Sequence, residues 1–101
     1  MQAWVPISAT DLDRLLRDEL AVCQPELVVV FERYRVVPFR APLQSDTLKD
    51  VFVVARRGNE ALYYEDVEEG FNFSRMSEDG RLLEHWCNQD GLRFALRRWQ
   101  E

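Results

Sequence analysis

Apolar and polar residues follow two different periods along this chain. From Leu12 to Cys23, apolar positions recur every three or four residues, which is typical of a surface helix with one buried face. Ser8 is a favourable N-cap residue, and Asp11, three positions later, completes a capping-box pattern. Pro25 disfavours helical geometry in the residue before it. The pattern therefore predicts a helix that begins after Ser8 and ends near Val22 or Cys23.

The next two segments are assigned by residue type. Leu27–Val37 is rich in β-branched and aromatic residues, so we expect a strand, with room for a short helical turn at Pro25–Val28 before it. Phe39–Lys49 follows Pro38 and contains a run of turn-forming residues, which favours an irregular loop.

Two hairpins are predicted after this loop. Val51–Arg57 and Glu60–Asp66 flank Gly58-Asn59, the two residues expected of a tight turn. This turn predicts the pairs Arg57 with Glu60, Ala55 with Leu62, Val53 with Tyr64, Val54 with Tyr63, and Phe52 with Glu65. A second hairpin around Asp79-Gly80, separated from the first by a bend or bulge at Gly70, predicts the pairs Met76 with Leu83, Arg75 with Glu84, and Phe73 with Trp86.

The last predicted element is a helix that begins at Asn88 and has one apolar stripe, made of Leu92, Ala95, Leu96 and Trp99. Residues 1–101 therefore predict a single α+β domain with an N-terminal helix, an antiparallel sheet of about four strands and a C-terminal helix. Both faces of the central hairpin are apolar and need cover. Either the helices lie on opposite faces, or a second subunit covers one face and makes a homodimer.

The composition excludes several classes of protein. Of the 101 residues, 47% are apolar and only four each are Gly and Pro, which excludes a disordered or low-complexity chain. No apolar run approaches the roughly 20 residues of a membrane helix. The N-terminus lacks the pattern of a secretory signal, so we expect a cytoplasmic protein with no membrane partner. Cys23 and Cys87 match neither a disulfide framework nor a zinc motif, and we expect both to be reduced structural residues.

The negative charge is concentrated in one segment. The net charge is -5, and residues 60–79 hold seven acidic side chains and one basic side chain, whereas the rest of the chain is nearly balanced. This disfavours nucleic acid or an anionic membrane as a partner and suits a basic protein, although a solvated surface that serves only solubility is the plainer interpretation. The predicted partner-binding residues are four carboxylates and one aromatic anchor: Glu65, Asp66, Glu68, Glu69 and Phe71.

A chemical alternative involves a second set of residues. His85 and Cys87 alternate on a predicted strand, so they could form a thiolate–imidazole pair or half of a metal site. Burial of Cys87 as a small hydrophobic residue explains the pattern without chemistry. The segment Glu65–Glu69 lacks the spacing of a calcium loop. We therefore expect no catalytic residue, no metal site and no cofactor.

Two stretches, YYEDVEEGFNFS at residues 63–74 and EHWCNQD at residues 84–90, resemble a family of small uncharacterised bacterial proteins. The likeness covers roughly residues 50–99. It implies a bacterial origin and a shared fold, and it implies no activity. Members of the family carry a glycine-rich segment before the central strand. Leu43–Asp50 lacks that segment, so we expect no phosphate-binding loop here.

These observations lead to two hypotheses about function. The first is a small acidic protein-interaction module, not an enzyme, and an inhibitor of a basic partner of the immunity or antitoxin type is its most concrete form. The alternative is a small-ligand-binding protein or enzyme that uses His85, Cys87 and the acidic segment Glu65–Glu69.

Overall fold

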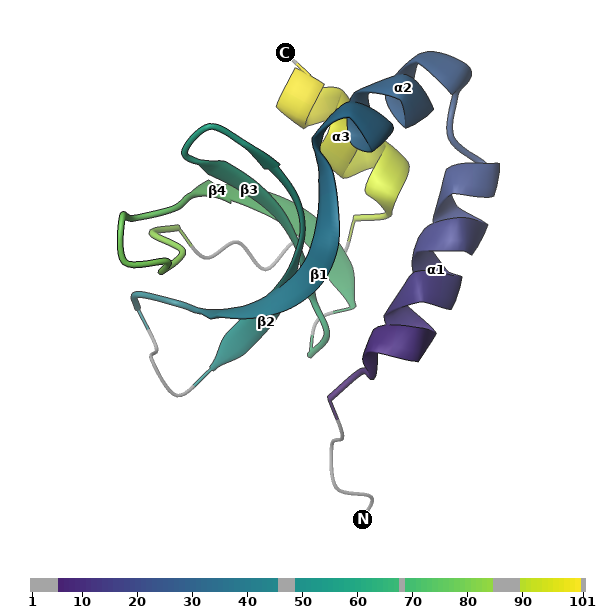
Figure 1. The fold of residues 1–101 in the computed structure, drawn as a ribbon. Coiled ribbons are helices and arrows are strands. Elements are labelled where there is room, and N and C mark those ends of the chain that lie inside the picture. The colour runs from purple at the N-terminus through teal and green to yellow at the C-terminus, as the bar shows by residue number, and fades with distance from the viewer. Residues whose placement is uncertain (1–5, 46–48, 68, 85–89, 101) are drawn as a thin grey trace.

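The computed structural model describes residues 6–45, 49–67, 69–84 and 90–100 (Figure 1). Three helices and four strands follow one another along the chain: α1 (Ala9–Ala21), α2 (Pro25–Tyr34), β1 (Arg35–Pro42), β2 (Asp50–Arg57), β3 (Glu60–Glu65), β4 (Gly70–Arg75) and α3 (Leu92–Gln100). The strands form one antiparallel sheet in the order β1-β2-β3-β4. The predicted α+β class is confirmed.

All three helices cover the same face of the sheet (Figure 1). The larger hydrophobic cluster lies between them and the strands, and α3 contacts α1, α2 and β4. The predicted stripe of α3 is buried in this cluster, as are Leu12 and Leu16 of α1. As predicted, Ser8 caps α1 by accepting a hydrogen bond from the backbone N–H of Asp11.

The second face of the sheet is covered by the sheet itself. β1 and β2 curve strongly in Figure 1, and Leu82 joins the two edges of the sheet. The N–H of Leu82 donates to the carbonyl of Pro42 (2.9 Å), the last residue of β1, and Leu82 also forms a bridge with Met76, the residue after β4. A second hydrophobic cluster, which includes Val53 and Tyr63, is enclosed inside this curve. The expectation of helices on opposite faces is therefore wrong. The single chain buries both faces by itself, so the apolar faces no longer argue for a covering second subunit.

The strand predicted over Leu27–Val37 is instead the helix α2 as far as Tyr34. Pro25 occupies the first turn, where its missing N–H costs no hydrogen bond. Leu27 and Phe31, four residues apart, are buried together against the core, whereas Val29 is 63% exposed. This helical burial pattern outweighs the β-propensity of the three consecutive valines.

The loop predicted over Phe39–Lys49 is also wrong in its first part, because β1 extends to Pro42. β1 is an edge strand, and an edge strand tolerates proline because one side of its backbone is not paired. Its register is irregular between Arg35 and Phe39, the stretch that contains Pro38.

The first predicted hairpin is confirmed, but its register holds only near the turn. Arg57 pairs with Glu60 and Ala55 with Leu62, as predicted. A bulge between Val53 and Ala55 then shifts the partners by one residue, and the observed pairs are Val53 with Tyr63 and Phe52 with Tyr64. An extra residue of this kind leaves no mark in the hydrophobic pattern.

The second predicted hairpin is present only as a turn. Gly80 has the positive φ of 85° that suits the turn, but Met76 pairs with Leu82, not with Leu83. The predicted pairing of Arg75 with Glu84 is seen as a backbone-to-side-chain contact, in which the N–H of Arg75 donates to the Glu84 carboxylate (3.2 Å). The predicted pair of Phe73 with Trp86 lies outside the described residues.

The boundaries of the last two elements also differ from the prediction. The left-handed residue between β3 and β4 is Glu69 (φ 56°), and Gly70 is the first residue of β4. Asn88 lies outside the described residues, and α3 begins at Leu92, later than predicted, after the non-helical Asp90 and Gly91. Among the described residues, no helix has the length and apolar character that crossing a membrane requires.

Candidate functional site

The structure separates the five predicted partner-binding residues. Glu65 (0% exposed), Asp66 and Phe71 (2% exposed) are buried in the single chain, whereas Glu69 is exposed. Glu68 lies outside the described residues. The expectation that a partner docks on Glu65–Glu69 and a partly exposed Phe71 is therefore corrected for Glu65, Asp66 and Phe71, because their side chains face inward.

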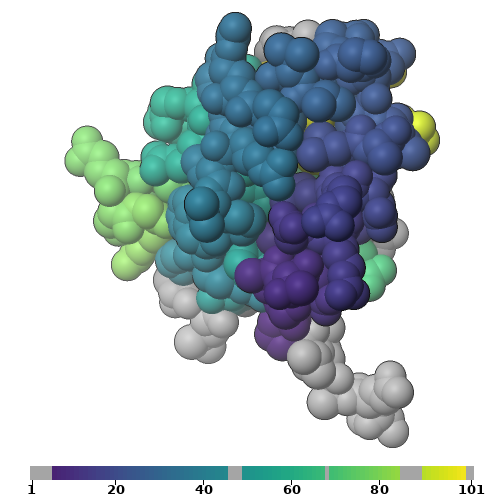
Figure 2. Space-filling model, turned by 45° about the vertical axis from the view of Figure 1, so that its right-hand side comes forward, coloured from purple at the N-terminus to yellow at the C-terminus, as the bar shows by residue number. Residues whose placement is uncertain are grey.

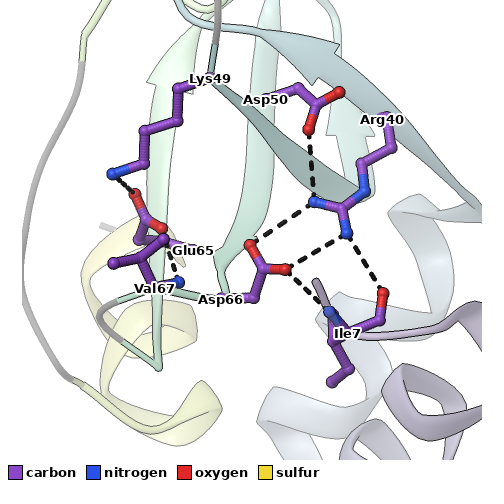
Figure 3. A network of polar contacts seen from close by, with 7 residues as sticks. All are labelled: Ile7, Arg40, Lys49, Asp50, Glu65, Asp66 and Val67. Atoms are coloured by element: carbon purple, nitrogen blue, oxygen red, sulfur yellow. Dashed lines mark hydrogen bonds and ion pairs between the residues drawn. The ribbon is translucent and has the colours of Figure 1, made fainter. Parts of the chain in front are cut away.

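Glu65 is held by a lysine and by the turn that follows it (Figure 3). One carboxylate oxygen, Oε2, lies 2.9 Å from Nζ of Lys49. The other oxygen, Oε1, accepts a hydrogen bond of 2.9 Å from the backbone N–H of Val67. The last residue of β3 thus fixes the backbone of the β3–β4 turn two residues further on.

Asp66 is held by an arginine and by the segment that leads into α1 (Figure 3). Arg40 of β1 donates two hydrogen bonds, from Nη2 to Oδ2 (3.2 Å) and from Nη1 to Oδ1 (3.5 Å). The N–H of Ile7 donates to Oδ2 (2.9 Å), and the carbonyl of Ile7 accepts from Arg40 Nη2 (3.2 Å). Asp50 lies 3.5 Å from the same guanidinium. Three distant parts of the chain therefore meet at one carboxylate.

The sheet register explains how Arg40 reaches this position. Arg40, Phe52, Tyr64 and Phe71 pair in succession across the four strands, so they form one row. The guanidinium of Arg40 lies over the Phe52 ring, 4.0 Å from its centroid, which gives the cation an apolar and electron-rich surface to pack on. At the other end of the row, the ring centroids of Tyr64 and Phe71 are 4.9 Å apart.

A notch of about 400 Å³ opens beside this row, between the start of α1 and the β3–β4 turn. We call it the Tyr64 notch; its lining is Pro6, Ile7, Asp11, Tyr64, Asp66, Val67 and Glu69. Figure 2 shows the start of α1 lying against β1. The notch combines an apolar wall with carboxylates from α1 and from the β3–β4 turn.

Tyr64 contributes a hydroxyl without a hydrogen-bond partner in the described part of the chain to the lining of the notch. Tyr64 is 7% exposed, and among the described residues its hydroxyl forms no hydrogen bond. Burial raises the pKa of Tyr64, and the carboxylates of Glu69 and Asp66 raise this pKa further. Tyr64 and both carboxylates line the notch, so the Tyr64 side chain lies in a field of negative potential.

A second hollow, of about 550 Å³, lies along β4 and is lined by Glu60, Asn72, Phe73, Ser74, Arg75, Glu84 and Arg98. Its charged groups are paired within the chain: Glu60 with Arg57, Arg75 with Glu84, and Arg98 with Asp90. This hollow therefore offers a ligand no uncompensated charge.

The residues of the chemical alternative are not brought together in the described part of the chain. His85 and Cys87 lie outside it, and Cys23 packs against the core between α1 and α2. No group of three or more His, Cys, Asp or Glu side chains in the described ranges is arranged to hold a metal ion.

Comparison with known proteins gives no match: no protein-family model, no curated protein and no solved structure is similar enough to this chain to carry an argument. The site is therefore interpreted from its own geometry.

Sequence reasoning missed the two cations and the N-terminal segment that hold the turn. Lys49 and Arg40 lie in the segment that the sequence predicts to be a loop, and nothing local connects them to the acidic segment. One signal was available. Residues 60–79 hold most of the excess acid, and any of these carboxylates that is buried needs a cation from elsewhere in the chain.

Proposed function

We propose that this chain is a protein-interaction module that uses the β3–β4 turn and the adjoining start of α1 to bind a basic partner protein. The observation that carries the proposal is the way the turn is held. Glu65 and Asp66 are buried beneath it and are paired with the partly exposed Lys49 and Arg40. The turn presents Val67 (46% exposed) and Glu69 to solvent.

A turn that is already fixed in one conformation favours the binding of a partner. Ordering a flexible loop on association costs free energy, and a loop that is already ordered avoids this cost. Buried ion pairs add little net stability compared with apolar residues of the same size, because desolvation offsets their attraction. Two such pairs under one turn are better explained by the conformation they impose. The left-handed backbone of Glu69 (φ 56°) is a further sign of an imposed conformation.

The exposed charge of the turn favours a basic partner. Glu69 forms no ion pair with any residue in the described ranges, so its charge is available to a partner. Val67 beside it supplies apolar contact area. An exposed charge next to an exposed apolar side chain provides both electrostatic steering and an anchor. An immunity- or antitoxin-type inhibitor of a basic protein in the cytoplasm is the concrete form of this proposal.

The test compares three immobilised proteins in capture from a bacterial lysate, with quantitative mass spectrometry as the readout. The first is the unaltered chain, and the second is the double variant Val67→Asp, Glu69→Gln. The third is Glu78→Gln, which neutralises an exposed carboxylate of the same acidic segment outside the Tyr64 notch. We expect a basic protein to be captured by the first and third proteins and lost with the second.

Purified partner then gives the kinetic test. Its association rate should fall as salt rises, because exposed charges are screened beyond a Debye length of about 8 Å at physiological ionic strength. Glu69→Gln should lower this rate more than Glu78→Gln does. Capture of the same proteins by all three immobilised chains, or of none with basic character, would contradict the proposal.

A further inference from the structure

We propose that the Tyr64 notch binds a single arginine side chain of the basic partner through its guanidinium group. This inference rests on the proposed function and adds to it the chemical identity of the anchoring group. Three observations carry it: the acceptors that line the notch, the unpartnered hydroxyl of Tyr64, and the apolar wall beside them.

The lining offers acceptors that the chain itself does not use. Asp66 accepts three hydrogen bonds, from Arg40 and Ile7, whereas a carboxylate has about four acceptor positions. Glu69 has no ion-pair partner in the described ranges. Asp11 has only an exposed contact with Arg14 at 4.0 Å, which is worth little.

The Tyr64 hydroxyl adds an acceptor of a different kind. The Tyr64 hydroxyl forms no hydrogen bond within the described ranges. In those ranges, the only side-chain polar atom that is both without a partner and fully buried is Nε1 of Trp99. The Tyr64 hydroxyl is therefore not fully buried. The hydroxyl therefore meets solvent at the notch while its ring stays in the core. A buried ring that carries a solvent-facing hydroxyl among carboxylates is suited to accept a hydrogen bond from a cation.

The arrangement of the acceptors in the notch favours arginine over lysine. Acceptors reach the notch from α1, from the end of β3 and from the turn, so they approach a bound cation from different directions. A guanidinium has five N–H donors in a rigid plane and serves several acceptors at once, whereas an ammonium is a compact and strongly hydrated charge. The apolar wall formed by Pro6, Ile7 and Val67 suits the methylene stem of the same side chain. A metal ion is disfavoured, since no metal-binding group of side chains is found in the described ranges.

The test uses the whole chain and three small probes: the Nα-acetyl methylamides of arginine, lysine and citrulline. Citrulline has the shape of arginine without the charge. Binding is followed by NMR through the ring signals of Tyr64 and the methyl signals of Val67. We expect saturable shifts with arginine at millimolar concentrations, weaker binding of lysine, and binding of citrulline weaker by about tenfold or more, because charge-assisted hydrogen bonds are the stronger kind.

Two variants localise the site. Tyr64→Phe keeps the ring and its packing but removes the hydroxyl, and we expect it to weaken arginine binding about fivefold, the value of one hydrogen bond. Glu69→Gln should weaken binding at least as much. The matched controls are Tyr34→Phe, which removes a hydroxyl outside the notch, and Glu78→Gln, which removes an exposed charge outside it. Both should bind arginine like the unaltered chain.

Three results would overturn the inference: no saturable shift at Tyr64 or Val67, equal binding of arginine and citrulline, or unchanged binding in Tyr64→Phe while circular dichroism shows that this variant is folded. These outcomes are separate from failure of the proposed function. If a basic partner is captured through Val67 and Glu69 but arginine does not bind, the proposed interaction module stands and the arginine site is wrong. If arginine binds but no partner is captured, the arginine site stands and the proposed interaction module is wrong.

Discussion

The carboxylate of Glu19, near the end of α1, accepts a hydrogen bond of 3.0 Å from the backbone N–H of Leu92, the first residue of α3. The first N–H groups of a helix have no partner inside the helix, so a cap must come from elsewhere. Here one helix caps another across 73 residues of sequence. Gly91 makes room for the contact, because a Cβ at this position would lie 3.1 Å from the same carboxylate oxygen.

Replacement of Glu19 should therefore destabilise the fold. We expect Glu19→Ala to lower the free energy of unfolding by about 1 kcal/mol, the usual value of a side-chain cap. Glu19→Gln keeps an acceptor and should cost less. Asp18→Ala, at the exposed neighbouring position, is the control and should stay within about 0.5 kcal/mol. Urea denaturation measures all three variants. Equal losses for Glu19→Ala and Asp18→Ala would mean that the contact contributes nothing.

The closure of the sheet by Leu82 gives a second prediction. Leu82 is buried, and Leu83 is partly exposed. We expect Leu82→Ala to lower the free energy of unfolding by about 2–5 kcal/mol, because it leaves a cavity in the second cluster. Leu83→Ala should cost far less, since the Leu83 side chain is 36% exposed and its removal leaves no buried cavity. Thermal or urea unfolding distinguishes them, and similar losses would show that Leu82 does not close the sheet.

The turn-holding network gives a third prediction. Removing one member of a buried ion pair typically costs 3–5 kcal/mol, because the other charge stays buried. Arg40 keeps 25% of its side chain exposed, so we expect Asp66→Ala to cost about 3 kcal/mol, the lower end of that range. Asp50→Ala, which removes a more exposed partner of the same guanidinium, should cost at most about 1 kcal/mol. Chemical denaturation of both variants checks the difference, and equal costs would contradict this account.

The Tyr64 hydroxyl gives a prediction about alkaline pH. Burial, and then the nearby carboxylates, raise the pKa of Tyr64 in the folded state. The folded chain thus holds this proton more tightly than the unfolded chain, in which a tyrosine titrates near pH 10. The contribution to stability is complete below that pH and is lost as the pH rises through the folded-state value. Urea midpoints against pH should fall less steeply in Tyr64→Phe, whereas an unchanged alkaline slope would contradict the shift.

Cys23 gives a prediction about thiol reactivity. Burial and then the Glu19 carboxylate raise the pKa of the Cys23 thiol, and Arg93 lowers it. Because the thiolate is the reactive form, we expect labelling of Cys23 in a Cys87→Ser background to be slower than labelling of a free cysteine peptide at the same pH. Arg93→Gln should slow it further. Labelling as fast as the peptide would show that this thiol is neither shielded nor shifted.

The elements that could be predicted are those whose signals are local. The cap at Ser8, the Gly58-Asn59 turn and the apolar stripe of α3 depend on neighbouring residues, and the structure confirms each of them. α2 could not be predicted in the same way. Its valines favour a strand on their own, and only the core into which Leu27 and Phe31 pack makes the helix the better solution.

By itself, the sequence determined the α+β class, the central hairpin and the concentration of acid in one segment, because period, turn chemistry and charge are properties of residues near one another in the chain. The tertiary structure alone decided where that acid points. Lys49 and Arg40 lie far enough from Glu65 and Asp66 in sequence that only the pairing of the strands brings them together. Once paired, these carboxylates hold the turn from beneath, and Glu69 remains outside because no cation in the described ranges reaches it.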